Sequence, residues 1–307
     1  MRRSFKHIVS SQFRSAVFGI AAAGLLFACV PAVAQAQRAG TFKPSKTPER
    51  IDAFEGDARL HSFRNQRLSG DYCFQFQLIH KPRRGANVYY EGTLWGSWSA
   101  TGPVSRVALQ PVVREGDVQL PVPRVELIVQ NGSHPAVWSR QGAEAGFARM
   151  EGAALFQPIL PEVLFRPFDL QMPYVYWQDY LYEGPDRIGR AGAVQVFRMY
   201  PPEGSSANRN GIEAVRIALD DTYNALRRAE VVGRDAEVES IFEARSFAKV
   251  QDQWIVREVS LKDTQTKDST TFRVKSAAVG IDLNPSIFDP VSKIMLPILE
   301  GTLFKDL

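Results

Sequence analysis

Short segments in which apolar and polar residues alternate, separated by turn residues, fill most of this chain and restrict its fold more than any other feature. In one of them Phe74, Phe76 and Leu78 share a face, while glutamines take the positions between them. This is the period of a β-strand with one buried face. Similar segments recur at short spacing, so we expect neighbouring strands to pair antiparallel through tight turns. The predicted strands are 72–78, 88–99, 104–113, 124–129, 136–140, 193–200, 213–220, 225–232, 237–249, 253–262 and 269–278.

One predicted strand, 88–99 (VYYEGTLWGSWS), is aromatic and is interrupted by Gly92 and Gly96. Glycine within a strand usually marks a bulge or a sharp bend, so the sheet is predicted to bend here. The last strands differ, because Phe272 and Val274 alternate with charged residues. That region is predicted to have one buried and one solvent-facing side.

The middle of the chain, 152–182, is densely apolar and aromatic but contains four prolines. Proline lacks the backbone N–H and clashes with the preceding helical turn, so neither one long helix nor a central strand can form here. Short helical turns are predicted instead, at 161–165 and 173–177.

A longer helix is predicted before the first strand. Thr47 has the N-cap position, Pro48 the first helical position and Glu49 the first turn, a combination typical of a helix start. The helix is predicted to end near residues 68–70.

The N-terminus has the pattern of a bacterial export signal. Residues 1–14 carry four Lys or Arg and no acidic residue, residues 15–30 are apolar, and two overlapping A-x-A sites follow at 32–36. These features together are typical of a cleavable signal peptide, and the apolar run is shorter than the ~20 residues that span a bilayer. We predict that residues 1–36 are removed, that residues 37–48 form a flexible leader and that the mature protein is periplasmic.

Cys29 leaves a second localisation open. Residues 26–29 (LFAC) look like a lipobox, where bacteria acylate a cysteine and cleave before it. Phe27 is bulky for its position, and a good A-x-A site lies just downstream, so soluble release is the preferred interpretation. A lipid anchor at Cys29 is the alternative, and mass spectrometry of the mature N-terminus distinguishes the two.

The charge balance gives no reason to expect a nucleic-acid partner. The full chain has 37 Lys and Arg against 33 Asp and Glu, and residues 1–36 hold four of the basic residues and none of the acidic ones. The remaining chain is therefore formally neutral, and the basic pI of the full chain comes from the export signal. It keeps one cysteine, Cys73, so no internal disulfide is expected.

No catalytic or metal-binding pattern is visible, and no cofactor is expected. His61, His80 and His134 have no metal-ligand spacing, and no nucleophile elbow or phosphate-binding glycine loop occurs. Cys73 is interpreted as a small packing residue on the face opposite Phe74. A hydrolase with a scattered site stays open as an alternative, since catalytic residues can come from separate strands.

Several segments resemble outer-membrane lipoprotein-sorting proteins of the LolA/LolB-like superfamily. The resemblance lies in the pattern of strands and hairpins over roughly residues 70–290, rather than in invariant catalytic residues. The segments are 215–220 (VRIALD), 226–230 (LRRAE), 249–256 (KVQDQWIV), 263–272 (DTQTKDSTTF), 287–290 (IFDP) and 163–170 (VLFRPFDL).

This resemblance implies an α+β fold, a strongly curved antiparallel sheet forming a half-open barrel of roughly eleven strands, with short helices covering its concave face. The hollow would hold acyl chains, and the proline-containing segment would act as a lid. The implied cavity and lid residues are Phe74, Phe76, Leu78, Trp95, Leu164, Phe165, Phe168 and Leu170.

The function implied for residues 49–290 is a non-enzymatic carrier that shields acyl chains of lipids or lipoproteins, with a role in outer-membrane lipoprotein sorting. The carrier is expected to be a monomer that contacts membranes or membrane-bound partners transiently. An envelope-stress sensor or partner-binding module on the same fold is the alternative. Residues 291–307 run past the usual end of the family and are predicted to pack on the domain.

Overall fold

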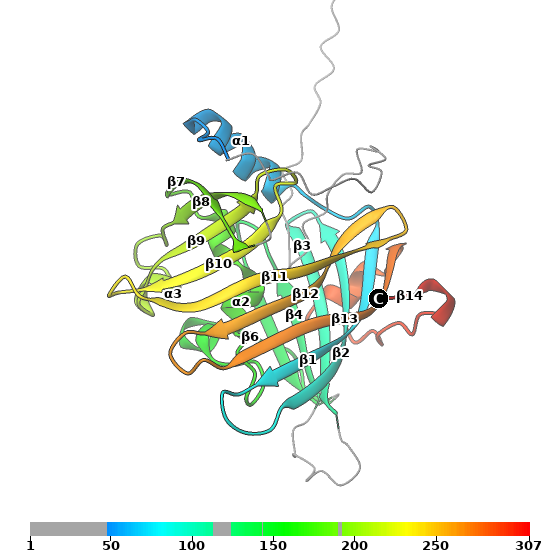
Figure 1. Cartoon of the computed structure of the whole chain (residues 1–307). Coiled ribbons are helices and arrows are strands. Elements are labelled where there is room, and N and C mark those ends of the chain that lie inside the picture. Colours follow the sequence, from blue (N-terminus) through cyan, green and yellow to red (C-terminus); the bar gives the residue numbers. More distant parts are fainter. Residues whose placement is uncertain (1–47, 113–123, 143, 190–191) are drawn as a thin grey trace, which may run out of the picture.

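The computed structural model describes residues 48–112, 124–142, 144–189 and 192–307, and one strongly curved antiparallel sheet dominates them (Figure 1). The predicted signal peptide, Cys29 and all but Pro48 of the predicted leader lie outside the described residues. None of the described helices is long and apolar enough to cross a membrane.

The first half of the chain forms one half of the sheet, and the second half of the chain forms the other. The first six strands step from the centre to one edge, a crossing segment then leads to the opposite edge, and the later strands step back until β13 pairs with β1. The order is β6-β5-β4-β3-β2-β1-β13-β12-β11-β10-β9-β8-β7, with β14 on β13. The strands are β1 (Asp71–Lys81), β2 (Val88–Ser99), β3 (Gly102–Pro111), β4 (Val125–Gln130), β5 (Ala136–Gln141), β6 (Ala148–Met150), β7 (Tyr180–Arg187), β8 (Ala193–Met199), β9 (Ile212–Asp220), β10 (Leu226–Gly233), β11 (Val238–Val250), β12 (Gln253–Asp263), β13 (Ser269–Ile281) and β14 (Lys305–Asp306).

The helices are short and lie around the sheet. In Figure 1, α2 sits inside the curve and α1 at one end of it. They are α1 (Ala53–Arg64), η1 (Gly152–Phe156), α2 (Pro167–Gln171), η2 (Pro173–Tyr176), α3 (Ser206–Arg209), η4 (Pro285–Phe288) and η5 (Gly301–Leu303).

The predicted curved antiparallel sheet with short helices is confirmed, with more strands than the eleven expected. The two additional main strands are the outermost ones, β6 and β7. Sequence patterns fail there because β6 has only three residues and β7 begins inside the proline-containing segment. Each therefore lacks a clean alternation.

Two helix predictions need correction. The first helix begins after Asp52, whose side chain accepts a hydrogen bond from the Glu55 amide at 2.8 Å, and it ends at Arg64. The N-cap therefore lies five residues after the predicted one, Thr47, because the Asp52 side chain supplies the capping bond. The turn predicted at 161–165 is not helical, whereas the one predicted at 173–177 appears as η2.

The concave and convex sides of the sheet are buried to different extents. The concave side carries the large apolar core along its whole width. The convex side of β1–β4 and β13 carries a second core, with Cys73, Trp95 and Ile128, covered by Leu283 and Ile287. These two residues belong to the C-terminal extension, which in the structure starts directly after β13, at residue 282, rather than at residue 291. The convex side of β7–β11 carries one small apolar cluster, which includes Val194 and Val196, and a ladder of ion pairs. Its contacts are Arg198–Glu183, Arg216–Glu183, Arg216–Glu230 and Arg228–Glu230, at 2.6, 2.7, 2.6 and 3.4 Å.

Gly92 and Gly96 make room for aromatic rings on the concave side of β2. The rings belong to the cross-strand partners of these glycines on β1, Phe76 and Tyr72. A Cβ at Gly96 would lie 2.0 Å from the Tyr72 ring, and one at Gly92 would lie 2.5 Å from the Phe76 ring. The glycines thus let large rings lie flat across the neighbouring strand, which fits a tightly curved sheet.

We therefore expect Gly92→Ala to destabilise the protein by about 1–3 kcal/mol, the usual cost of overpacking a core. The added methyl would also lie 2.6 Å from the Ala108 carbonyl oxygen, which is backbone and cannot rotate away. Urea unfolding checks this. Gly146→Ala is the control, because nothing lies within 4 Å of its added Cβ, and a cost equal to that of Gly92→Ala would contradict the packing argument.

Candidate functional site

The crossing segment, residues 152–178, covers the concave face between the two open edges of the sheet. It is rich in aromatic side chains that stack on one another: Phe156 on Phe168 with ring centres 5.1 Å apart, and Phe168 on Tyr174 at 5.9 Å. Burial raises the pKa of the Tyr174 hydroxyl well above its usual range. These rings pack into the concave core.

The crossing segment contains its own folded unit, α2. Pro167 takes the first position of this helix, and Asp169 accepts hydrogen bonds from the Arg166 amide and guanidinium at 2.9–3.0 Å. The nearby carboxylate raises the pKa of Arg166. This pair therefore caps the start of α2 from within the segment. The carbonyls at the end of the helix, Leu170 and Gln171, are bonded from the sheet by Asn131.

Side chains, rather than paired backbone, hold the crossing segment in place. Within the described ranges, no backbone-to-backbone hydrogen bond joins residues 152–178 to a strand. Four anchor side chains bond to its backbone instead. They are Tyr90 (to Pro161 O, 3.0 Å), Asn131 (to Leu170 O and Gln171 O, 3.0 and 2.7 Å), Thr270 (from Leu164 N, 3.0 Å) and Arg64 (to Val175 O and Trp177 O, 2.7 and 3.0 Å).

The crossing segment fills most of the hollow beneath it. A residual cavity of about 30 Å³ remains between the segment and the sheet, with no polar surface. From the segment it is lined by Ile159, Phe165 and Leu170; from the sheet it is lined by Phe76, Leu78, Leu94, Val107, Leu109 and Phe272. A bound acyl chain of any length would therefore have to displace residues of the crossing segment.

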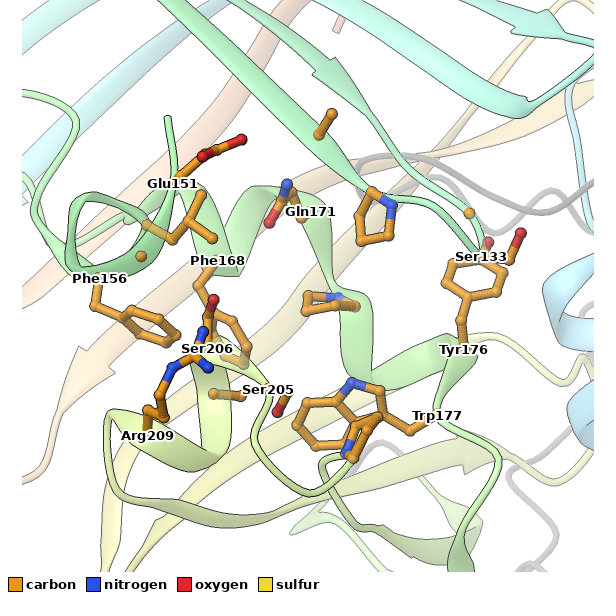
Figure 2. A pocket seen from close by; sticks show the side chains of 18 of the residues that line it. Ser133, Glu151, Phe156, Phe168, Gln171, Tyr176, Trp177, Ser205, Ser206 and Arg209 are labelled. Atoms are coloured by element: carbon orange, nitrogen blue, oxygen red, sulfur yellow. The ribbon is translucent and has the colours of Figure 1, made fainter. Parts of the chain in front are cut away.

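A larger pocket of about 750 Å³ opens at the mouth of the half-barrel (Figure 2). It lies between β6 and the loop before β5 on one side and α3 on the other, with the crossing segment as its floor. Figure 2 shows the rings of Phe156, Phe168, Tyr176 and Trp177 around it. This volume is in the range of small-molecule sites.

The rim of this mouth pocket is polar but balanced in charge. Its ionisable side chains are Arg149 and Arg209 against Glu151 and Asp179. Arg149 and Glu151 pair at 3.1 Å, and both are largely exposed. An apolar floor with a neutral polar rim suits an amphiphilic ligand better than a strongly charged one.

Apart from Trp95, the structure places the predicted site residues in three locations. Phe76, Leu78, Phe165 and Leu170 meet around the small cavity, whereas Phe168 lines the mouth pocket. Phe74 is fully buried in the concave core, and Leu164 is partly buried against it.

Trp95 does not lie with the other predicted residues, and this corrects the prediction. It belongs to the convex core, although its neighbour Leu94 faces the hollow. Strand β2 has large apolar side chains on both faces, so hydrophobicity alone could not tell which face is concave.

Sequence patterns do not identify the three anchors on the sheet. Tyr90 and Thr270 are ordinary residues for a strand, and Asn131 resembles a turn residue after β4. Each of the three is 0% exposed, so their polar groups must find partners inside the protein. Only the folded structure shows that the hydrogen-bond partners of all three side chains lie in the crossing segment.

His80 supports the Thr270 anchor. Its Nδ1 lies 3.1 Å from the Thr270 hydroxyl. This hydroxyl accepts a hydrogen bond from the Leu164 amide and can donate one to Nδ1 of neutral His80. Burial lowers the pKa of His80 from its ordinary value of 6.5, against the opposing effect of Asp268 and Glu162. Neutral His80 is thus the form that fits this anchor.

We expect the protein to lose stability as the pH falls through about 6.5 toward the lowered pKa of His80. In that window the unfolded chain binds a proton that the folded chain does not, so the free energy of unfolding decreases as the pH decreases. Urea unfolding at several pH values checks this. His80→Gln should flatten the slope in this window, and the exposed His134→Gln should keep it; an unchanged slope in His80→Gln would contradict this assignment.

The described residues offer little that resembles a nucleophile or a metal site. Burial raises the pKa of the Cys73 thiol to about 12, and its side chain packs in the convex core as interpreted from the sequence. No group of three His, Cys, Asp or Glu side chains within the described ranges could hold a metal ion. Asp220 accepts the Thr222 and Tyr223 amides, which is a turn role.

Comparison with known proteins finds relatives by structure alone. No family model matches the sequence, and no curated protein matches it. A DUF1329 family protein from Desulfovibrio piger matches with a TM-score of 0.62 and 14% identity, over 77% of this chain and 95% of that one. A putative outer membrane lipoprotein-sorting protein domain from Vibrio parahaemolyticus matches with a TM-score of 0.62 and 15% identity, over 77% and 94%.

A third solved structure, a LolA superfamily protein from Nitrosomonas europaea, matches with a TM-score of 0.51 and 12% identity, over 72% of this chain and 90% of that one. Identities this low carry information about the fold and not about the ligand. Together with the curved, open antiparallel sheet and its crossing segment, these likenesses show that the chain has the LolA-like superfamily fold.

Proposed function

We propose that this protein is a non-enzymatic carrier in the bacterial periplasm that shields the acyl chains of a lipid or lipoprotein. One observation carries the proposal: the apolar concave face is covered by a segment that no backbone hydrogen bond ties to the described strands. Such a cover can leave without breaking the sheet. A solved structure with the same fold is described as a putative lipoprotein-sorting domain, which supports this class of function.

In this proposal an acyl chain enters at the mouth pocket and replaces the crossing segment over the concave face. Each methylene transferred from water contributes about 0.8 kcal/mol, so a long chain can offset the loss of the aromatic contacts made by the segment. The four anchors return the segment when the ligand leaves. The protein would act as a monomer and touch membranes, or partners on them, only transiently.

Lipid extraction from the protein, purified from an expressing bacterium, tests this proposal. Mass spectrometry of the extract should find acyl lipids in near-stoichiometric amount, and a fluorescent fatty-acyl probe should bind the delipidated protein and be displaced by them. A protein that carries no lipid and binds no probe would exclude acyl carriage.

A partner-binding role on the same fold is the second candidate, and the filled interior favours it. The residual cavity of about 30 Å³ holds no ligand larger than a few atoms unless the segment moves. Capture of a membrane-anchored protein that survives delipidation, by a chain that binds no acyl probe, would favour this candidate over carriage.

A further inference from the structure

The C-terminal extension is fixed to the sheet at both ends but leaves a loop between them. At its start, Leu283 and Ile287 are buried in the convex core. At its end, β14 pairs with β13, and the Leu307 amide donates to the Lys275 carbonyl at 2.9 Å. The loop between these ends, residues 290–298 (PVSKIMLPI), has no helix or strand.

This loop exposes large apolar side chains to solvent. Val291 is 83% exposed, Met295 89% and Ile298 100%. The one charged residue in the loop is Lys293. A folded chain gains nothing from exposing three such side chains on one short loop, so a partner surface is expected to cover them.

A cationic groove lies beside the loop. Its volume is about 930 Å³, and its other wall is formed by Trp95 of β2, by β4 and β5, and by the loop between β5 and β6. The basic side chains that line it are Arg124, Arg140 and Lys293; the acidic ones are Glu126 and Glu144. Glu126 is shared by three guanidinium groups, of Arg106 at 2.7 Å, Arg140 at 2.9 Å and Arg124 at 3.4 Å, so this cluster keeps a net positive charge.

The groove also has surplus hydrogen-bond donors. Two side chains that line it, Trp95 and Arg140, each keep a buried N–H (Nε1 and Nε) without an acceptor among the described residues. Buried donors normally find acceptors. These two atoms are themselves buried, so phosphate oxygens would bind first to the exposed basic side chains of the groove, Arg124 and Lys293.

We propose that this loop and groove are where the protein docks on an anionic phospholipid surface. Val291, Met295 and Ile298 enter the interfacial region of the bilayer, while the basic side chains of the groove bind lipid phosphates. A stable protein interface needs roughly 20–30 residues on each side, far more than this loop offers. A few apolar side chains with adjacent basic groups are enough for reversible membrane contact. The proposal does not depend on acyl carriage by the concave face.

Vesicle co-sedimentation tests the proposal, with all proteins carrying Cys29→Ser so that no acyl chain on that residue holds them to lipid. The protein should bind vesicles of mixed phosphatidylcholine and phosphatidylglycerol more tightly than vesicles of pure phosphatidylcholine. High salt should reduce this preference. Met295→Ser/Ile298→Ser should weaken binding at least tenfold. Lys293→Gln should weaken it about fivefold.

Phe54→Ser is the matched control, because Phe54 is also 83% exposed but lies on α1. It should bind the mixed vesicles like the parent protein. No binding by the parent, unchanged binding by the double variant, or an equal loss in Phe54→Ser would overturn the proposal. A parent dimer in sedimentation velocity that the double variant abolishes would assign the loop to a second copy of the chain, and would overturn it too.

Discussion

Asn131→Ala is expected to raise the affinity of the protein for a fluorescent acyl probe roughly 25-fold while lowering its stability by about 2 kcal/mol. The Asn131 amide donates to the Leu170 and Gln171 carbonyls, and its side chain is 0% exposed. Its removal leaves two buried carbonyls unpaired, at a cost of about 1–3 kcal/mol. If the crossing segment must leave before the probe binds, this cost falls on the closed state alone, and the open, binding-competent fraction rises by the same factor.

The effect on affinity separates a displaceable segment from general loosening of the fold. Val196→Ala is the matched variant, because Val196 lies in a small apolar cluster with Ile188 and Val194, apart from the concave core. It should cost roughly 2 kcal/mol of stability without changing probe affinity. Probe titration and urea unfolding measure both quantities for each variant. Equal gains in affinity for the two variants, or none for Asn131→Ala, would refute displacement of the segment.

The same reasoning explains which parts of the fold were predictable from sequence. Phe74, Phe76 and Leu78 alternate with glutamines, so both the strand and its buried face follow from a local period. The predicted antiparallel sheet required only such local patterns and short turns. The order of the strands follows from β13 pairing with β1, about 200 residues away in sequence, and depends on the resemblance rather than on any local signal.

The predicted grouping of the site residues agrees with the structure only in part, because it depends on which surfaces meet. Phe165 and Leu170 lie over Phe76 as implied, since an apolar segment without strand character has to cover an apolar sheet. Trp95 lies on the opposite face because a distant segment, the C-terminal extension, covers that side of β2. A local pattern contains no information about such a cover.

The convex side also contains a buried ion pair, Arg106 with Glu126, and loss of its carboxylate should cost more stability than any other substitution considered. Arg106 is 1% exposed and donates to Glu126 at 2.7 and 3.2 Å and to the Ile287 carbonyl at 2.9 Å. Arg140 donates to the same Glu126 oxygen at 2.9 Å. Glu126→Ala is therefore expected to destabilise the protein by about 3–5 kcal/mol, because it leaves a buried guanidinium without its carboxylate.

Two further variants show whether the cost comes from the unpaired charge. Arg106→Met/Glu126→Leu removes both charges and should recover most of the loss, since apolar residues of similar size often replace a buried ion pair without penalty. Glu151→Ala, which breaks the exposed pair with Arg149, should cost at most about 1 kcal/mol. Urea unfolding ranks the three. If the double variant is as unstable as Glu126→Ala, lost packing rather than an unpaired buried charge accounts for the effect. In that case the apolar contacts of the extension, and not Arg106, hold it to the sheet.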